Sequence, residues 1–232
     1  MIGFDPLYFV FLAPALLLGI WAQFRVKAAY AVASQQTTSS HLSGAQVARG
    51  ILDSFGLQNI GIEPSHGFMS DHYDPKAKVL RLSPDVYQGR SIASFGIAAH
   101  EAGHAIQDAN HYAPLRIRNG IVPMAAVGSN ASWFLLFMGF VLNSMNLILI
   151  GIGLFSLVVV FQLINLPVEF NASKRAKEIL VARGFISPQE QRAVAKVLDA
   201  AALTYVAATV TAILTLLYYL VRAGLIGGNS RD

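Results

Sequence analysis

Three long runs of the sequence carry no charged residue. Residues 6–24, 119–168 and 200–221 contain no Asp, Glu, Lys or Arg and consist mainly of apolar side chains. A helix needs about 20 mostly apolar residues to cross the hydrocarbon core of a membrane. The first and last runs therefore predict one membrane-spanning helix each, over 6–24 and 200–221.

The middle run is too long for a single crossing. As one helix, residues 119–168 would extend about 75 Å, more than twice the thickness of the hydrocarbon core of a bilayer. The polar segment at 143–146 (NSMN) interrupts the run and predicts a turn. We therefore expect two spans here, over 121–142 and 147–166, and four spans in the whole chain.

The first span has an alternative interpretation as a cleaved signal peptide. Residues 31–34 (AVAS) resemble the small-residue site at which such peptides are cut. However, Asp5 precedes the apolar run where a signal peptide carries basic residues, and Arg25 and Lys27 follow it. This arrangement favours a helix that is retained as a membrane anchor.

Basic residues are concentrated in two segments between the spans. All of the 17 Lys and Arg residues except Arg222 and Arg231 lie in segments 25–118 and 167–199. Cytoplasmic loops of membrane proteins are enriched in Lys and Arg. We therefore expect a multi-pass protein of the cell membrane, with both basic segments in the cytoplasm and both chain ends outside.

The overall composition agrees with a membrane protein. Hydrophobic residues make up 54% of the chain and charged residues 13%, and the mean hydropathy is +0.51. These values exclude a disordered chain and a wholly soluble enzyme, and the lack of Cys excludes a disulfide scaffold. Any metal must therefore be bound by His, Asp or Glu. The net charge of +4 is ordinary for a membrane protein with basic cytoplasmic loops, and we expect no nucleic-acid partner.

The two basic segments contain shorter elements. Ser43 and Gln46 form a capping-box pattern that starts a helix, and Gly56 suits its C-terminal end. Ser187 and Glu190 have the same spacing and predict the start of another helix. The remaining predictions are a polar linker over 28–48, strands over 57–62, 67–73 and 78–82, and helices over 91–108 and 169–183.

The segment His100-Glu101-Ala102-Gly103-His104 has the H-E-x-x-H pattern inside a predicted helix. Residues four apart lie on one face of a helix, so both imidazoles can reach one cation while Glu101 acts on a water molecule beside it. The alternative is a chance arrangement on an exposed helix. Apolar residues surround the pattern, however, and an unpartnered Glu would be costly there, which favours the metal site.

A third metal ligand must lie elsewhere, because a catalytic zinc site usually has three protein ligands and one open position. His111 follows His104 without the spacing or the Gly of the metzincin pattern, and we expect it in a loop. Glu169 is the better candidate, because it follows the apolar run and two spans would return the chain to the same side of the membrane. Its alternative role is a carboxylate at a helix N-terminus, stabilised by the helix dipole.

Three segments of the chain resemble a known family. The sequences HEAGHAIQDA at 100–109 and PVEFNASKRAKEIL at 167–180, together with residues 70–99, are similar to the YugP-type neutral zinc metallopeptidases of bacterial membranes. More distantly, they resemble the HtpX-type membrane metalloproteases, which are gluzincins. The resemblance covers residues 40–205.

The resemblance implies a single bound Zn²⁺ ion and a Glu general base. The implied ligands are His100, His104 and Glu169, and the implied base is Glu101. One departure concerns the HtpX-type Asp that lies four residues beyond the ligand Glu and orients a ligand imidazole, because this chain has Ser173 there. Either Ser173 or Asn165 could replace it by hydrogen bonding, or both could only cap the helix or face solvent.

Residues 71–74 (DHYD) are candidates for stabilising the oxyanion that forms during peptide hydrolysis. His72 or Tyr73 could project from the end of a strand over the metal, whereas the alternative is an ordinary polar hairpin turn. The predicted strand at 78–82 could also bind an extended substrate along its edge, with little side-chain selectivity.

Together, these observations predict a mainly α membrane protein with four transmembrane helices and a small α+β, gluzincin-like cytoplasmic catalytic domain. The predicted activity is zinc-dependent endopeptidase action on membrane or membrane-associated proteins. The alternative is a metal-stabilised membrane scaffold or adaptor that does not cleave its partners. A purely structural zinc site tends to have a fourth protein ligand, and none is evident, which favours catalysis. Ion transport is disfavoured because the apolar runs contain no charge.

Overall fold

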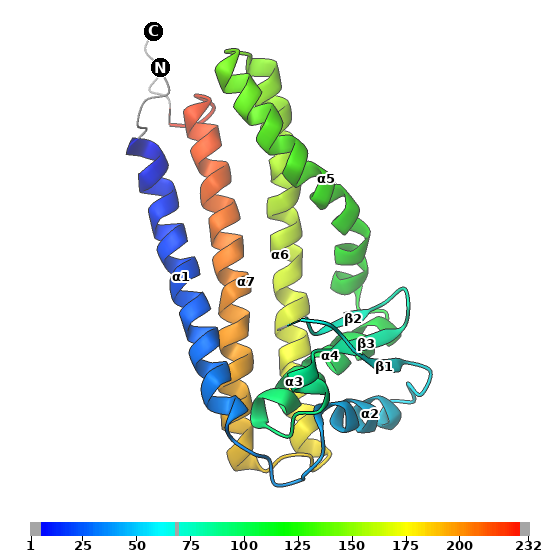
Figure 1. The fold of residues 1–232 in the computed structure, drawn as a ribbon. Helices are drawn as coiled ribbons and strands as arrows, with labels where there is room; N and C mark the ends of the chain where they lie inside the picture. The colour runs from blue at the N-terminus through cyan, green and yellow to red at the C-terminus, as the bar shows by residue number, and fades with distance from the viewer. Residues whose placement is uncertain (1–5, 68–69, 228–232) are drawn as a thin grey trace. The chain divides into compact units, whose positions relative to one another are not determined.

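The computed structural model describes residues 6–67 and 70–227 and is mainly helical, with a small sheet (Figure 1). In these residues the helices are α1 (Pro6–Ser34), α2 (Gly44–Ser54), α3 (Pro84–Tyr87), α4 (Ile92–Ala109), α5 (Ala113–Val141), α6 (Met145–Ala182) and α7 (Pro188–Arg222). The strands are β1 (Gly61–Pro64), β2 (His72–Asp74) and β3 (Val79–Leu82).

Helices α1, α5, α6 and α7 are each long and apolar enough to cross a membrane. They overlap the four predicted spans, with Leu142 of the predicted span at 121–142 lying just beyond α5, so the prediction of four candidate membrane-spanning helices is confirmed. The helices are longer than the apolar runs. α1 continues to Ser34, so the polar linker predicted at 28–48 is wrong in its first part, where Ala-rich sequence favours helix.

Helix α6 corrects a second boundary. It runs without a break from Met145 to Ala182, with Pro167 inside it. The helix that the sequence predicts at 169–183 is therefore the C-terminal part of α6. Glu169 lies well within this helix and not at its N-terminus, so the interpretation of Glu169 as a carboxylate stabilised by a helix dipole is wrong.

Contacts between residues divide the chain into two compact units, each with its own buried core. The span unit comprises Met1–Trp21, Ile117–Leu166 and Tyr205–Asp232. The site unit comprises Ala22–Arg116 and Pro167–Thr204. Helices α1, α5, α6 and α7 contribute residues to both.

The span unit has a core of aliphatic and aromatic side chains and an apolar surface. The buried residues of its main cluster are Leu136, Ile148, Ile152, Tyr218 and Tyr219. Large apolar side chains on the helices of this unit are exposed, among them Leu16, Leu17, Val127, Phe134 and Phe137. A surface of this kind is typical of helices that face lipid.

The sheet of the site unit has the strand order β1-β3-β2 (Figure 1). β1 pairs with β3 in parallel, and β2 pairs with β3 antiparallel, with His72 opposite Arg81. Because β3 is the central strand, both of its edges are already paired. The expectation that the strand at 78–82 binds substrate along its edge is therefore wrong, and the outer edges belong to β1 and β2.

Two predicted helix starts in the site unit are confirmed. The hydroxyl of Ser43 accepts a hydrogen bond from the amide of Gln46, whose side chain accepts one from the amide of Ser43 at 2.8 Å. At the start of α7, the carboxylate of Glu190 accepts a 2.6 Å hydrogen bond from the amide of Ser187. Gly56, just past α2, has a φ of +73°, which glycine adopts without strain.

Helix α4 is the centre of the site unit and is buried along most of its length. Phe95 and Ile106 on α4 pack in one core with Ile51 of α2, Leu80 of β3 and Leu180 of α6. α4 approaches α6 closely, because a Cβ atom placed on Gly103 would lie 3.0 Å from the carbonyl oxygen of Ala172. A glycine at this position therefore allows the two helices to bring their side chains together.

Candidate metal centre

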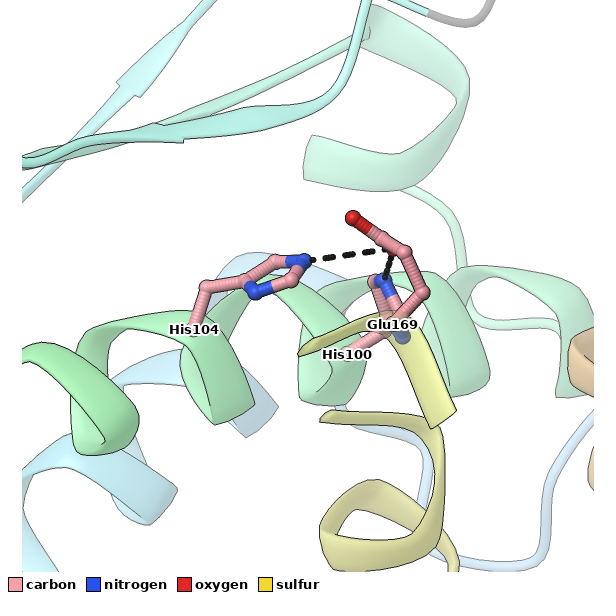
Figure 2. A group of neighbouring side chains, drawn as sticks. All are labelled: His100, His104 and Glu169. Atoms are coloured by element: carbon pink, nitrogen blue, oxygen red, sulfur yellow. Dashed lines mark hydrogen bonds and ion pairs between the residues drawn. The ribbon is translucent and has the colours of Figure 1, made fainter. Parts of the chain in front are cut away.

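Three side chains from α4 and α6 converge in the site unit (Figure 2). His100 and His104 lie one turn apart on α4, and their Nε2 atoms are 3.2 and 3.6 Å from Oε2 of Glu169 on α6. Candidate ligand atoms of all three residues lie within 4.8 Å of one another. The structure thus brings together the three residues that the sequence predicts as metal ligands.

The spacing of these atoms suits a zinc ion. Zinc binds imidazole nitrogen and carboxylate oxygen at about 2.0–2.2 Å with tetrahedral angles, so two ligand atoms on one ion lie about 3.3–3.5 Å apart. The two measured nitrogen–oxygen separations, 3.2 and 3.6 Å, bracket this value. The two imidazole rings are nearly perpendicular, at 86°, which lets both nitrogens point at one position.

Glu101 is buried beside these residues, with 9% of its surface exposed. Burial raises the pKa of its carboxyl to about 7, because charge is poorly solvated there. The positive charge of His100 lowers this pKa, and the negative charges of Glu169 and Asp71 raise it. A carboxyl with a pKa near neutrality can both accept and return a proton under ordinary conditions.

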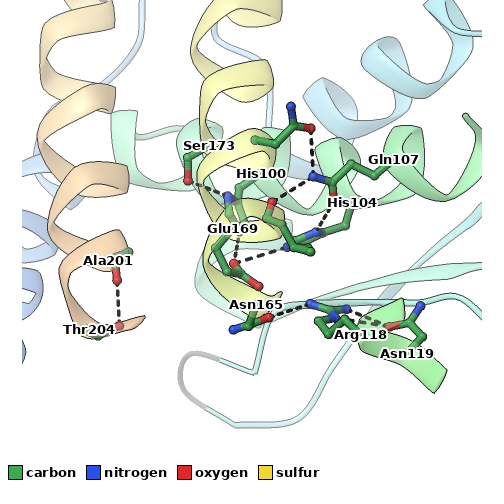
Figure 3. Close-up of polar contacts among 12 residues, drawn as sticks. His100, His104, Gln107, Arg118, Asn119, Asn165, Glu169, Ser173, Ala201 and Thr204 are labelled. Atoms are coloured by element: carbon green, nitrogen blue, oxygen red, sulfur yellow. Dashed lines mark hydrogen bonds and ion pairs between the residues drawn. The ribbon is translucent and has the colours of Figure 1, made fainter. Parts of the chain in front are cut away.

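Both imidazoles are also held at their second nitrogen, Nδ1 (Figure 3). Nδ1 of His100 lies 3.1 Å from the hydroxyl of Ser173 on α6. Of Ser173 and Asn165, the two candidates for orienting a ligand imidazole, it is therefore Ser173 that contacts a histidine ring. The side chain of Asn165 instead accepts a 3.4 Å hydrogen bond from Arg118 within the span unit.

The partner of His104 is Gln107, which sequence reasoning missed. Its side-chain oxygen lies 3.0 Å from Nδ1 of His104. The only signal in the sequence is that Gln107 follows His104 by one helical turn, a spacing shared by many unrelated pairs.

Comparisons with known proteins agree with this geometry. Residues 8–224 match the family described as "Putative neutral zinc metallopeptidase". The chain belongs to this family. It is 48% identical over 225 residues to the "Putative membrane protease YugP" of Bacillus subtilis (strain 168), covering 97% of this chain and 98% of the relative. No solved structure matches the chain.

Membership of the zinc metallopeptidase family gives the cluster on α4 and α6 its chemical context. The family description specifies zinc as the metal and peptide hydrolysis as the activity. The donor set of two imidazoles and one carboxylate is typical of catalytic zinc sites. The group therefore fits the metal that the family implies.

The two candidates on β2, Tyr73 and His72, lie in different environments. Tyr73 is buried, and its hydroxyl donates a 2.7 Å hydrogen bond to Asp108, which also binds Lys78 at 2.6 Å. Through this hydrogen bond Tyr73 links β2 to α4, which is a structural role. His72, the residue before Tyr73 on β2, is exposed, and when protonated it lowers the pKa of Glu101.

The ring of His72 has a defined orientation. Its Nδ1 lies 2.8 Å from the carbonyl oxygen of Ser70. A carbonyl only accepts, so Nδ1 carries the hydrogen, and Nε2 can donate only when the ring is protonated. His111 lies in the turn after α4 with a φ of 53°, and it is not among the clustered ligands of the described residues.

Proposed function

We propose that this protein is a membrane endopeptidase in which His100, His104 and Glu169 hold one Zn²⁺ ion. The observation that carries the proposal is the convergence of both Nε2 atoms on the Glu169 carboxylate. Support for the metal and for the reaction class comes from the zinc metallopeptidase family. The α4 and α6 segments with the small sheet would form a gluzincin-like catalytic domain.

Glu101 is the general base in this proposal. When bound, the ion would polarise the scissile carbonyl and make a nearby water molecule more acidic. Glu101 accepts the proton of the attacking water and delivers it to the leaving amine. His72, when protonated, would donate a hydrogen bond from Nε2 to the developing oxyanion.

The sheet provides a place for an extended substrate. β2 is an outer strand, so one of its edges borders no other strand of the described sheet, and it packs against α4, the helix that carries Glu101 and both histidines. Main-chain hydrogen bonds along this edge would hold a peptide with little dependence on its side chains. We infer that the substrates are membrane or membrane-associated proteins, supported by the four candidate spans and the name of the Bacillus relative.

The proposed orientation places the catalytic residues in the cytoplasm. It rests on the distribution of Lys and Arg, because all but Arg222 and Arg231 lie in the two segments between candidate spans. The chain has no Cys, so single cysteines can report topology directly. Ser144→Cys, between α5 and α6, should react with an impermeant thiol reagent outside intact cells, whereas Ser39→Cys should not. Labelling of Ser39→Cys alone would invert the orientation.

The rival function is a metal-stabilised scaffold that binds membrane proteins without cleaving them. Glu101→Gln separates the two, because Gln has the size of Glu but does not accept the proton. We expect zinc content to be retained and cleavage of a membrane-protein substrate to fall about 10²- to 10⁴-fold. Glu178→Gln, an exposed change on α6, is the matched control and should leave turnover unchanged. Equal cleavage by the wild type and Glu101→Gln would contradict the assignment of the base.

A further inference from the structure

Gln107 is a buried amide that joins α4 to α6 beside the proposed metal ligands (Figure 3). None of its surface is exposed. Its side-chain oxygen faces Nδ1 of His104 at 3.0 Å, and its side-chain nitrogen donates to the carbonyl of Val168 at 2.9 Å and to Asn171 at 3.0 Å. Because a buried amide without partners costs free energy, these bonds restrict Gln107 to one arrangement.

The backbone of α6 fixes which end of the amide faces His104. The carbonyl of Val168 can only accept, so the NH₂ group of Gln107 must point toward α6. Its oxygen must then point toward His104. An amide oxygen only accepts, so Nδ1 of His104 carries a hydrogen, and in the neutral ring the lone pair lies on Nε2. Nε2 is the atom that faces Glu169.

A second bond on α6 holds the far side of the amide. The side-chain oxygen of Asn171, which accepts from Gln107, also accepts a 2.8 Å hydrogen bond from Nε of Arg175. Arg175 is always charged and only donates, so it fixes the orientation of the Asn171 amide. Arg175 therefore fixes Asn171 as the acceptor from Gln107. The amide of Gln107 is then oriented with its oxygen toward His104.

The other imidazole lacks this constraint. Ser173 contacts Nδ1 of His100 through a hydroxyl, which can either donate or accept. Ser173 is therefore compatible with both neutral forms of the His100 ring. Gln107, by contrast, is compatible with only one neutral form of the His104 ring, the form with hydrogen on Nδ1.

We propose that Gln107 is a positioning residue for metal binding, which holds His104 in the form that presents its Nε2 lone pair. Asn171 and Arg175 support it from α6. The inference rests on the metal site proposed above and adds to it the group that prepares the second histidine. Outer hydrogen-bond partners of metal-ligating histidines commonly act in this way and contribute about 10- to 100-fold to metal affinity.

The test compares zinc binding by the full-length protein in detergent, measured by competition with a chromophoric chelator. Gln107→Leu has similar volume but removes all three hydrogen bonds, and it should weaken zinc binding about 10- to 100-fold. Gln107→Glu keeps an oxygen facing Nδ1 and should bind zinc more tightly than Gln107→Leu. The visible absorption of the cobalt-substituted protein should change in Gln107→Leu, because the imidazole is free to turn.

Gln191→Leu is the matched control. The side chain of Gln191 also donates to a backbone carbonyl of α6, that of Lys177 at 3.1 Å, but it contacts no histidine in the described structure. Its zinc affinity should equal that of the wild type. The thermal midpoint of each metal-free variant measures how much stability is lost with the side-chain hydrogen bond to α6, independently of zinc binding.

Each outcome bears on a different statement. Equal zinc affinity in the wild type and Gln107→Leu would overturn the inference while leaving the metal site intact. If Gln107→Leu is too unstable to measure, Gln107→Glu decides between the outcomes. A metal-free Gln107→Glu variant that is as stable as the wild type but binds zinc 10-fold or more weakly would also overturn the inference. A wild-type protein that binds no zinc would instead contradict the proposed function.

Discussion

Several hydroxyl groups of the span unit bond differently from the polar groups around the proposed metal ligands. In the span unit, the hydroxyls of Ser156, Thr211 and Thr215 donate to carbonyls four residues earlier in the same helix. In the site unit, Ser173 bonds to His100 and Gln107 to Asn171, and the partners are 73 and 64 positions apart in the sequence. A hydrogen bond within one helix forms wherever that helix lies. A hydrogen bond between two helices forms only if the helices pack at one particular position along each other.

This difference predicts which substitutions should affect function. Removing a hydroxyl that bonds to its own helix leaves the neighbouring helices where they were. Removing a group that bonds across elements changes the position of a side chain on the other element. Function should therefore be sensitive to changes of the polar groups that bond between α4 and α6, and tolerant of the loss of hydroxyls that bond within their own helix in the span unit.

The largest difference is expected for a metal ligand. Glu169→Ala removes one of three proposed ligands and should lower zinc affinity by more than the roughly 10- to 100-fold typical of an outer partner. Thr215→Ala in the span unit, also a buried polar residue, should leave zinc affinity unchanged. Chelator competition measures both. Tight, stoichiometric zinc in Glu169→Ala would remove Glu169 from the ligand set.

A methyl group added between α4 and α6 should have the next largest effect. In Gly103→Ala the new Cβ would meet the backbone oxygen of Ala172 at 3.0 Å, and overpacking of this kind costs about 1–3 kcal/mol. Gly153→Ala, in the span part of α6, meets nothing within 4 Å and should change stability little. The thermal midpoints of both variants test this. A Gly103→Ala variant as stable as Gly153→Ala would show that the helices can separate freely.

Glu101→Gln should stabilise the metal-free protein at alkaline pH. The pKa of Glu101 is raised to about 7 in the folded state, so ionisation opposes folding, and stability is lost as pH rises through about 7. Gln avoids this loss and should gain on the order of 1–3 kcal/mol above pH 8, with no gain below pH 4.5. Thermal midpoints at a series of pH values provide the measurement. A difference between variant and wild type that does not grow with pH would contradict the prediction.

The smallest effect is expected for the hydroxyl beside His100. Ser173→Ala should weaken zinc binding by about tenfold, the lower end of the range for an outer partner, because Ser173 restrains the ring without fixing its form. Ser156→Ala in the span unit also removes a hydroxyl from α6 and should bind zinc like the wild type. If both variants bind zinc equally, the contact between Ser173 and His100 has no role in metal binding.

The features that the sequence predicts correctly depend on local signals. Charge-free runs predict the four candidate spans, because lipid compatibility is a property of each residue and its neighbours. The capping residues Ser43 and Ser187 predict helix starts, because each bonds to an amide three residues away. Clustering of His100, His104 and Glu169 follows from the H-E-x-x-H spacing and the count of intervening spans.

The features that the sequence misses depend on contacts between distant segments. The order of the strands follows from pairing between β1 and β3, which no local signal specifies, so the central position of β3 was not predictable. Helix α6 continues past Pro167, because the end of an apolar run marks a change of environment and not a change of backbone hydrogen bonding. Gln107 acquires its role only when α6 supplies Val168 and Asn171.

The carboxylate of Asp108 links the strands of the sheet to the last turn of α4. It accepts hydrogen bonds from Tyr73 on β2 and from Lys78 just before β3, so the hairpin can open only if both bonds break and buried Tyr73 enters solvent. Backbone amides of the hairpin and of this turn should therefore exchange with deuterium at similar rates, as one cooperative folding unit. The strand β2 would then be as rigid as the helix that carries both histidines.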